Sequence, residues 1–331
     1  MKQEWKIDVP VLLIFFARPD TLKPVFESIK EAKPSTLLLW QDGPRENRPD
    51  DLENIQKCRE IVEDIDWDCK VYKMYNEKNY GCDPSTFYSH KWAFSIVDKC
   101  IILEDDRIPS QSFYPYCKYL LDKYENDERI NHICGANLLD VYEECPNDYF
   151  FAPCGSTVWA TWKRVADSWD EKYLCLDDKY NWSCLEKLYG EELVKVWYDT
   201  AVRHKNAGVP YWESVLGIDA LLHSRLAIIP KKNMSTDIGL TENATHTHSH
   251  SECMPKKLLG MFNMKRYELE FPLNEPEHIV ADMNYMDKLS YFNGIGHPLI
   301  RFGRKITYFA KCIRYGQLGL LLKSLKRKFL K

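Results

Sequence analysis

Short apolar runs alternate with amphipathic stretches over the first 136 residues of the chain. Apolar runs that end at turn-forming residues are typical of buried strands, and apolar positions at helical spacing between them are typical of covering helices. The pattern therefore predicts an α/β protein with a mainly parallel central sheet flanked by helices. The expected strands are 9–17, 37–41, 70–74, 100–104 and 130–135, and the expected helices are 21–33, 51–64, 85–98 and 111–124.

The second half of the chain, from about residue 137, is less regular. Here we expect one helix over 186–204 and one strand over 226–230. We divide the chain into residues 1–136 and 137–255, as two halves of one domain, and a C-terminal extension over 256–331.

The end of this extension predicts a basic amphipathic helix. It would either pack on the body or lie on an anionic membrane surface. Its apolar positions recur at helical spacing among Lys and Arg residues, at Leu318, Leu321, Leu322, Leu325 and Phe329.

The composition is that of an ordinary folded domain, because 45% of the 331 residues are hydrophobic and 28% are charged. No stretch reaches the roughly 20 apolar residues of a membrane span, and the N-terminus lacks the cleavage site of a signal peptide. Twelve cysteines without a C-x-x-C pair favour reduced thiols over a disulfide framework or a structural zinc site. We expect a cytoplasmic protein that meets a membrane, if at all, from the inner face of the cell membrane.

The charge is unevenly distributed along the chain. The net charge is −4, but residues 299–331 hold ten Lys or Arg residues and no Asp or Glu, which leaves about −14 on the remainder. An acidic body argues against nucleic acid as the main partner, whereas the basic end suits an anionic membrane surface.

Polar residues follow several of the predicted strands: Arg18, Asp42, Asn79 and the run Glu104-Asp105-Asp106. Ligands of open α/β sheets collect at the carboxyl ends of the strands. Three adjacent carboxylates repel one another unless a cation lies among them, and Mg²⁺ or Mn²⁺ prefers oxygen ligands and bridges to phosphates. The alternative explanation of such a triplet is a solvated turn.

Further motifs occur in a fixed order over residues 9–250. They are PVLLIFFARPD at 10–20, Gln41-Asp42-Gly43, Asn79-Tyr80-Gly81 with Lys91-Trp92, Glu104-Asp105-Asp106 with Pro109-Ser110 and Phe113-Tyr114, the segment from Gly155 to Trp159, Trp212-Glu213, and Pro230, Asn233 and Ile238-Gly239 with ATHT at 244–247. The ordered set resembles the nucleotide-sugar glycosyltransferases of GT-A fold. It is closest to the bacterial hemolytic protein HlpA-like family and, more distantly, similar to N-acetylglucosaminyltransferase I.

The resemblance implies a GT-A fold and a nucleotide-sugar site at these strand ends. Asp42 would accept a hydrogen bond from a uracil ring, and Asp106 would bind the metal ion directly. The residues that would line the nucleotide, hold the ribose or position the site are Phe16, Ala17, Arg18, Asn79, Gly81, Lys91, Glu104 and Asp105. His246, in the Thr-His-Thr segment, would bind the metal or a phosphate oxygen, or is a surface histidine.

Glu213 matches the position where the relatives carry an acid, usually Asp, after a tryptophan. We expect it to be the general base that deprotonates the acceptor hydroxyl, although the longer side chain displaces the carboxylate. The alternatives are a charged helix start and another acid as base, at Asp219, Asp177 or Asp178. One or two of the tryptophans in this half could line an acceptor sugar, while most belong to the core.

The reading that these features favour is a metal-dependent glycosyltransferase, with Mn²⁺ or Mg²⁺ as cofactor. It would move a sugar from a nucleotide diphosphate donor, most readily a UDP-sugar, to a hydroxyl of a glycan or lipid-linked glycan, with inversion by kinship. A sugar-phosphate nucleotidyltransferase is the first alternative, but Arg18-Pro19-Asp20 lacks the glycines of its usual phosphate loop. A non-catalytic membrane-binding or lytic protein is the second.

Overall fold

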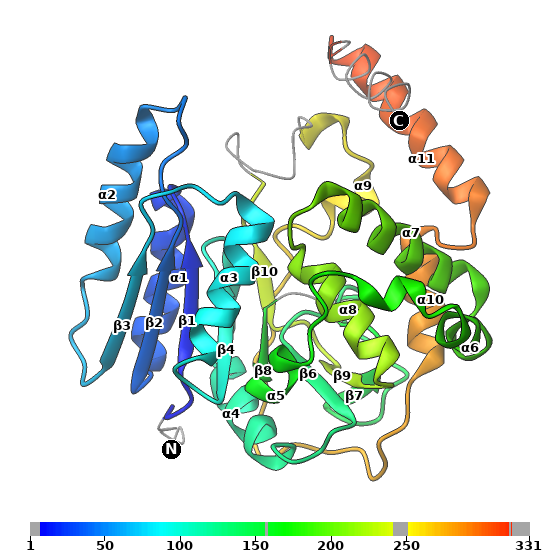
Figure 1. The fold of residues 1–331 in the computed structure, drawn as a ribbon, viewed down its shortest axis with the longest axis horizontal. Helices are drawn as coiled ribbons and strands as arrows, with labels where there is room; N and C mark the ends of the chain where they lie inside the picture. The colour runs from blue at the N-terminus through cyan, green and yellow to red at the C-terminus, as the bar shows by residue number, and fades with distance from the viewer. Residues whose placement is uncertain (1–6, 156–157, 241–250, 318, 320–331) are drawn as a thin grey trace.

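The structure, a computed structural model, describes residues 7–155, 158–240, 251–317 and 319. Its centre is one eight-stranded sheet in the order β3-β2-β1-β4-β8-β6-β9-β7 (Figure 1). The strands of this sheet are β1 (Val11–Phe15), β2 (Thr36–Gln41), β3 (Lys70–Tyr75), β4 (Lys99–Glu104), β6 (Ile130–Cys134), β7 (Tyr149–Ala152), β8 (Trp159–Trp162) and β9 (Leu226–Pro230). Two short strands, β5 (Arg107–Pro109) and β10 (Ser235–Asp237), pair antiparallel beside it.

The half of the sheet made by β3, β2, β1 and β4 is entirely parallel. All five residues of β1 are buried, because a strand with helices on both faces of its sheet is apolar on both sides. In the other half, β8 runs antiparallel to β4 and β6, and β7 runs antiparallel to β9. The α/β architecture with a mostly parallel sheet is thus confirmed, and the sheet joins strands from residues 1–136 and 137–255. The proposed division of the chain stays a prediction.

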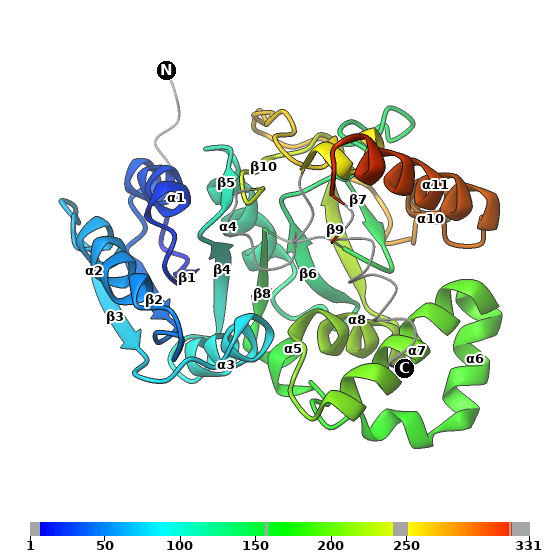
Figure 2. The same ribbon diagram turned by 90° about the horizontal axis from the view of Figure 1, so that it is seen from above.

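Helices cover both faces of the sheet. Figure 2 shows α1 and α2 on one side of the first strands, and α3, α5 and α8 on the opposite side. The helices are α1 (Pro19–Ala32), α2 (Asp50–Val62), α3 (Cys82–Phe94), α4 (Phe113–Lys123), α5 (Lys163–Asp167), α6 (Lys179–Tyr189), α7 (Glu191–Ala207), α8 (Trp212–Leu222), α9 (Lys256–Leu259), α10 (Met283–Asn293) and α11 (Pro298–Arg314), with 3₁₀ turns η1 (Leu174–Asp177) and η2 (Ser251–Cys253).

The helix predicted over 186–204 is wrong as one element, because the chain forms α6 and α7 there. Gly190 separates them with a φ of +86°, in the left-handed region that interrupts an α-helix. The apolar periodicity continues across the break, and for this reason it predicts a single helix. The basic helix predicted over 318–329, apart from residue 319, lies outside the described residues, and so does His246.

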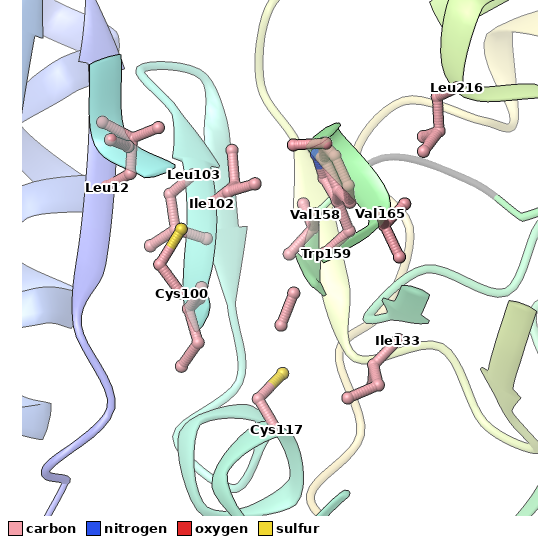
Figure 3. Close-up of a cluster of buried hydrophobic side chains, with 14 of the residues drawn as sticks. Leu12, Cys100, Ile102, Leu103, Cys117, Ile133, Val158, Trp159, Val165 and Leu216 are labelled. Carbon is pink, nitrogen blue, oxygen red and sulfur yellow. The ribbon is translucent and has the colours of Figure 1, made fainter. Parts of the chain in front are cut away.

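The main hydrophobic core lies where the two halves of the sheet meet (Figure 3). Leu12 and Ile102, from β1 and β4, are buried in the same cluster as Trp159 of β8 and Ile133 of β6. Truncating a fully buried leucine such as Leu12 to alanine costs about 2–5 kcal/mol. This packing fixes β1 against β4 and so fixes the loops that follow them.

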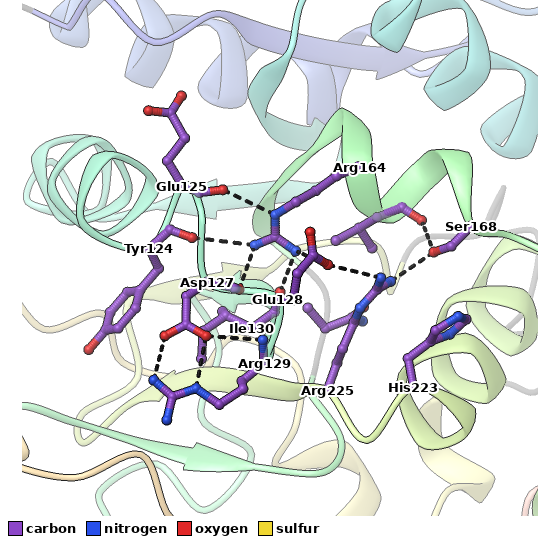
Figure 4. A network of polar contacts seen from close by, with 12 residues as sticks. Tyr124, Glu125, Asp127, Glu128, Arg129, Ile130, Arg164, Ser168, His223 and Arg225 are labelled. Carbon is purple, nitrogen blue, oxygen red and sulfur yellow. Dashed lines mark hydrogen bonds and ion pairs between the residues drawn. The ribbon is translucent and has the colours of Figure 1, made fainter.

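Two arginines, Arg164 and Arg225, hold the loop between α4 and β6 against neighbouring segments (Figure 4). Arg164 donates to backbone carbonyl oxygens, those of Tyr124, Glu125, Asp127 and Ile130. Arg225, which is buried, donates to Asp219 Oδ2 at 3.1 Å and to Ser168 Oγ at 2.7 Å. Arg225 also donates to Glu128 Oε2 at 3.3 Å. Loss of Asp219 would leave the buried guanidinium with one carboxylate fewer and should lower the free energy of unfolding.

Candidate functional site

A pocket opens at the carboxyl ends of β1, β2 and β4. In this sheet β1 lies between β2 and β4, so the strand order reverses at β1: the chain passes from β1 to β2 and β3 on one side and then to β4 on the other. Open α/β sheets bind ligands at such a reversal point. The residues that line this strand-end pocket are Ile14, Phe15, Phe16, Ala17, Arg18, Asp42, Arg45, Asp50, Asp51, Asn54, Asn79, Gly81, Cys82, Ser85, Thr86, Glu104 and Asp105. Eight of the predicted site residues therefore come together: Phe16, Ala17, Arg18, Asp42, Asn79, Gly81, Glu104 and Asp105.

Arg18 holds two of the three adjacent acids. It follows β1 and precedes Pro19, whose fixed φ suits the first position of α1. Its guanidinium donates to Asp105 and lies 2.9 Å from Asp106 Oδ2. Burial lowers the pKa of Arg18, but the charges of Asp105 and Asp106 outweigh burial and raise the pKa above its ordinary value. The acid run is thus partly neutralised from within the chain.

Glu104 makes no ion pair with the residues that the structure describes. Burial raises its pKa to about 8, the neighbouring charge of Asp106 adds to the shift, and the charge of Arg107 partly opposes it. The pKa of Asp105 is also raised, because burial outweighs the effect of Arg18. A positive charge brought into the pocket would reverse these shifts, because it favours the ionised form of a carboxyl group.

Asp42 organises the loop on the other side of the strand-end pocket. Its carboxylate accepts hydrogen bonds from the backbone N–H groups of Gly43 at 3.0 Å, Tyr80 at 3.0 Å and Gly81 at 3.1 Å. Burial nevertheless raises its pKa. Asn79 Nδ2 donates to the Gly43 carbonyl at 2.7 Å, which closes the same loop. Most of the acceptor capacity of Asp42 is therefore used by the backbone, and its contact with a uracil ring stays a prediction.

Asp106 lies beside this pocket, immediately before β5. Its Oδ1 atom is buried and accepts no hydrogen bond from the residues that the structure describes, and Arg107 Nε lies 3.8 Å from it. Arg107 instead pairs with Asp237 at 2.9 Å, and Asp237 accepts the Gly239 N–H at 2.8 Å. The sequence analysis missed Asp237, because the acid stands alone after a segment with no clear periodicity.

The part of the chain that the structure describes holds no metal site built from protein groups alone. Among residues 7–155, 158–240, 251–317 and 319, no group of three or more His, Cys, Asp or Glu residues is arranged to hold a metal ion. Mg²⁺ is commonly bound through one or two carboxylates together with substrate phosphates. The unsatisfied oxygen of Asp106 fits a single ligand of that kind, and Mn²⁺ or Mg²⁺ stays a prediction.

A second pocket adjoins the first half of α8. We call it the tryptophan pocket, and it is lined by His132, Leu138, Pro153, Cys154, Gly155, Trp159, Trp197, Trp212, Glu213, Leu216, Gly217 and Ala220. Trp159 and Trp212 stack with ring centroids 5.6 Å apart. Burial lowers the pKa of His132 to about 4, so this ring is neutral at pH 7. Three indoles line this pocket, and the contact of one or two tryptophans with an acceptor sugar stays a prediction.

Glu213 is exposed in the first turn of α8 and lines the tryptophan pocket. Its charge contributes to the raised pKa of Glu104. The two carboxyl groups are therefore electrostatic neighbours, one on each pocket. Glu104 lines the strand-end pocket and Glu213 lines the tryptophan pocket, so the charges of the two pockets act on each other through this pair.

Lys91 does not join this assembly. Its Nζ donates to the Ala166 carbonyl at 2.7 Å and lies 5.6 Å from the Trp169 ring. The other candidate acids line neither the strand-end pocket nor the tryptophan pocket. Asp219 pairs with Arg225, Asp178 caps α6 by accepting the Asn181 N–H, and Asp177 ends η1.

Arg45 and Asp51 are pocket residues that the sequence analysis missed. The guanidinium of Arg45 donates to Asp51 through Nε at 2.7 Å and through a second nitrogen at 2.6 Å. It also lies 5.2 Å from the Phe16 ring, which fixes that aromatic side chain at the pocket wall. In the sequence both residues stand in a charged stretch that reads as a solvated loop, so no local signal marks them.

Comparison with known proteins leaves the family open. The sequence matches no protein-family profile and no curated protein. Among solved structures, 4-diphosphocytidyl-2C-methyl-D-erythritol synthase from Anaerococcus prevotii is similar over 52% of this chain and 77% of its own, with 13% identity and a TM-score of 0.28. A TM-score this low carries no argument about the fold or the function of this chain.

Proposed function

We propose that this chain is a glycosyltransferase that moves a sugar from a nucleotide diphosphate, most readily a UDP-sugar, to a hydroxyl of a glycan or glycolipid. One observation carries the proposal: Glu104 of the strand-end pocket and Glu213 of the tryptophan pocket are close enough for the charge of Glu213 to raise the pKa of Glu104. A transferase of this kind needs a site for an activated donor, an adjoining site for the acceptor, and a base between them.

The charges of the strand-end pocket favour a donor that arrives with a divalent cation. Its lining holds five carboxyl groups and only two arginines, of which Arg45 is occupied by Asp51 and Arg18 by Asp105. A bare diphosphate would be repelled by the remaining acids. Asp106 would hold such a cation through its Oδ1 atom, and the chemistry supplied there would be charge neutralisation for the leaving diphosphate.

The chain's own residues would then bind and orient the two substrates. Phe16, held by Arg45, offers an aromatic face to the nucleotide base, and Arg18 keeps Asp105 and Asp106 in place beside the phosphates. The acceptor sugar would stack on the indoles of the tryptophan pocket, and Glu213 would take the proton of the attacking hydroxyl. The expected reaction is a direct displacement with inversion at the anomeric carbon.

A sugar-phosphate nucleotidyltransferase would use the same strand-end pocket. Such an enzyme needs cationic groups that are free to bind a nucleoside triphosphate, whereas Arg18 is engaged by two carboxylates and Arg45 by Asp51. It would also have no use for an acceptor pocket lined by tryptophans. The geometry therefore favours the glycosyltransferase.

The test is a transfer assay with Mn²⁺ and a panel of UDP-, GDP-, dTDP- and CMP-sugars, against glycan and lipid-linked acceptors. The proposal predicts release of the nucleotide together with a glycosylated product, in wild type and not in Glu213→Gln. Release of pyrophosphate from a sugar phosphate and a nucleoside triphosphate would replace it with the nucleotidyltransferase. Lysis of red cells without any transfer would support the non-catalytic alternative.

A further inference from the structure

The last described helix, α11, carries a stripe of apolar side chains that faces away from the protein. The stripe consists of Leu299, Phe302, Ile306, Phe309 and Ile313, each between 52% and 83% exposed. Their spacing alternates between three and four residues, which places them on one face of an α-helix. The stripe is about 21 Å long, because fourteen steps of ~1.5 Å separate residue 299 from residue 313.

The opposite face of α11 attaches the helix to the body. Cys312 is fully buried beside Cys253 of η2, and Lys311 Nζ donates to the Met254 carbonyl at 2.7 Å. Arg304 donates to the carbonyl oxygen of Phe292 at the end of α10. These contacts hold the helix with its apolar stripe outward, and the helix projects at the edge of the molecule (Figure 1).

The charges beside the stripe are all positive. Arg301, Lys305 and Arg314 are exposed on α11, and the helix contains no Asp or Glu. Two copies of the protein joined through this stripe would bring these cations together without an acid on either helix to pair with them. An anionic lipid surface satisfies both features, since it accepts apolar side chains and attracts Lys and Arg.

We propose that α11 docks the protein on an anionic membrane surface, with the stripe from Leu299 to Ile313 inserted at the boundary between headgroups and acyl chains. This surface docking differs from spanning, since within the described part of the chain no helix has the length and apolar character to cross a bilayer. The docking rests on α11 alone and does not depend on the reaction that the protein catalyses.

The test is co-sedimentation of the full-length protein with vesicles of phosphatidylcholine, with or without phosphatidylglycerol. The proposal predicts binding to the anionic vesicles only, weakened when salt is raised because screening shortens from about 10 Å at ~0.1 M to about 3 Å at ~1 M. The double variant Phe302→Ser/Phe309→Ser should reduce vesicle binding by about tenfold or more. The control Leu188→Ser, on α6 and 63% exposed, should bind like wild type.

Circular dichroism and sedimentation equilibrium without lipid complete the experiment. The double variant should keep the secondary structure of wild type, because the exchanged side chains are exposed. Equal vesicle binding by wild type and the folded double variant would overturn the proposal and assign binding to the basic chain beyond Arg314. A wild-type dimer that becomes a monomer in the double variant would also overturn it, in favour of a second copy as the occupant.

Discussion

Gly239 lies directly against the carboxylate of Asp106, so that a β-carbon at residue 239 would overlap Asp106 Oδ2. The backbone holds the two segments together, because the Ile238 N–H donates to the Asp106 carbonyl at 2.9 Å. A loop that follows β10 thereby sets the position of an acid that follows β4. The proposed cation site depends on this contact between distant parts of the sequence.

We predict that Gly239→Ala weakens metal-dependent UDP binding while the protein stays folded. The added methyl group must displace the Asp106 side chain, since the space is already filled. Calorimetric titration of UDP in the presence of Mn²⁺ measures the effect. Gly303→Ala on α11 is the matched control, because a β-carbon there meets no atom within 4 Å. Unchanged UDP affinity in Gly239→Ala would separate this contact from the cation site.

Arg18 and Asp105 form an ion pair, and we expect the single variant at Arg18 to lose more stability than the double variant. Arg18→Met leaves the buried Asp105 carboxylate without its cation and should lower the free energy of unfolding by about 3 kcal/mol. Breaking a buried ion pair costs about 3–5 kcal/mol, and the lower value applies here because about a fifth of the Arg18 side chain is exposed. Adding Asp105→Asn should restore part of this loss. Urea unfolding measures the cycle, and simple additivity of the two changes would show that the pair is not coupled.

Glu213 and Asp219 can be told apart as candidates for the base. Glu213→Gln should reduce transfer by roughly 10²–10⁴-fold and leave UDP binding unchanged, because its carboxylate lies on the tryptophan pocket. Asp219→Asn should lower the melting temperature, because the buried Arg225 loses the charge of Asp219 and keeps that of Glu128. The specific activity of the folded protein should stay unchanged. Full transfer activity in a folded Glu213→Gln variant would show that Glu213 is not the base.

His90 should make the protein sensitive to mild acid. Its ring is buried among Trp159, Trp169 and Trp212, and neither nitrogen has a hydrogen-bond partner among the described residues. Burial lowers its pKa to about 3. The unfolded chain binds this proton near pH 6.5, so the free energy of unfolding should fall by up to about 1.4 kcal/mol per pH unit below that value, until pH approaches about 3.

The variant His90→Phe removes this group, and no hydrogen bond is lost with it. Urea unfolding at about pH 7 and about pH 5.5 should show a smaller loss of stability in the variant than in wild type. His278→Phe, at an exposed histidine, is the matched control and should behave like wild type. An equal pH dependence in wild type and His90→Phe would mean that His90 is hydrated or protonated in the folded state.

The strands of the parallel half could be predicted from the sequence because each is an uninterrupted apolar run between turn residues. β9 occupies the predicted residues, Leu226–Pro230. β7 and β8 were missed because each has only four residues, all buried and partly aromatic, and so short a run carries no periodicity. Gly190 was missed as a helix break because a single glycine inside an amphipathic pattern is also tolerated within helices.

The site could be predicted wherever a residue directly follows a parallel strand. Arg18, Asp42 and Glu104 meet because the carboxyl ends of β1, β2 and β4 lie at one edge of the sheet. Lys91 is different, because it stands nine residues after the start of α3, or about 13 Å along the helix from the end that lines the pocket. Arg45 and Asp237 come from loops whose placement depends on tertiary packing, and the sequence carries no local sign of it.

Binding of UDP with and without Mn²⁺ tests the central claim most directly. Calorimetric titration should show micromolar affinity in wild type that requires the metal and is lost in Asp106→Asn. Asp178→Asn is the matched control, because asparagine also caps a helix and Asp178 lies at the start of α6, outside both pockets. A folded wild type without metal-dependent affinity for UDP, GDP, CMP or dTDP would contradict the proposed donor site.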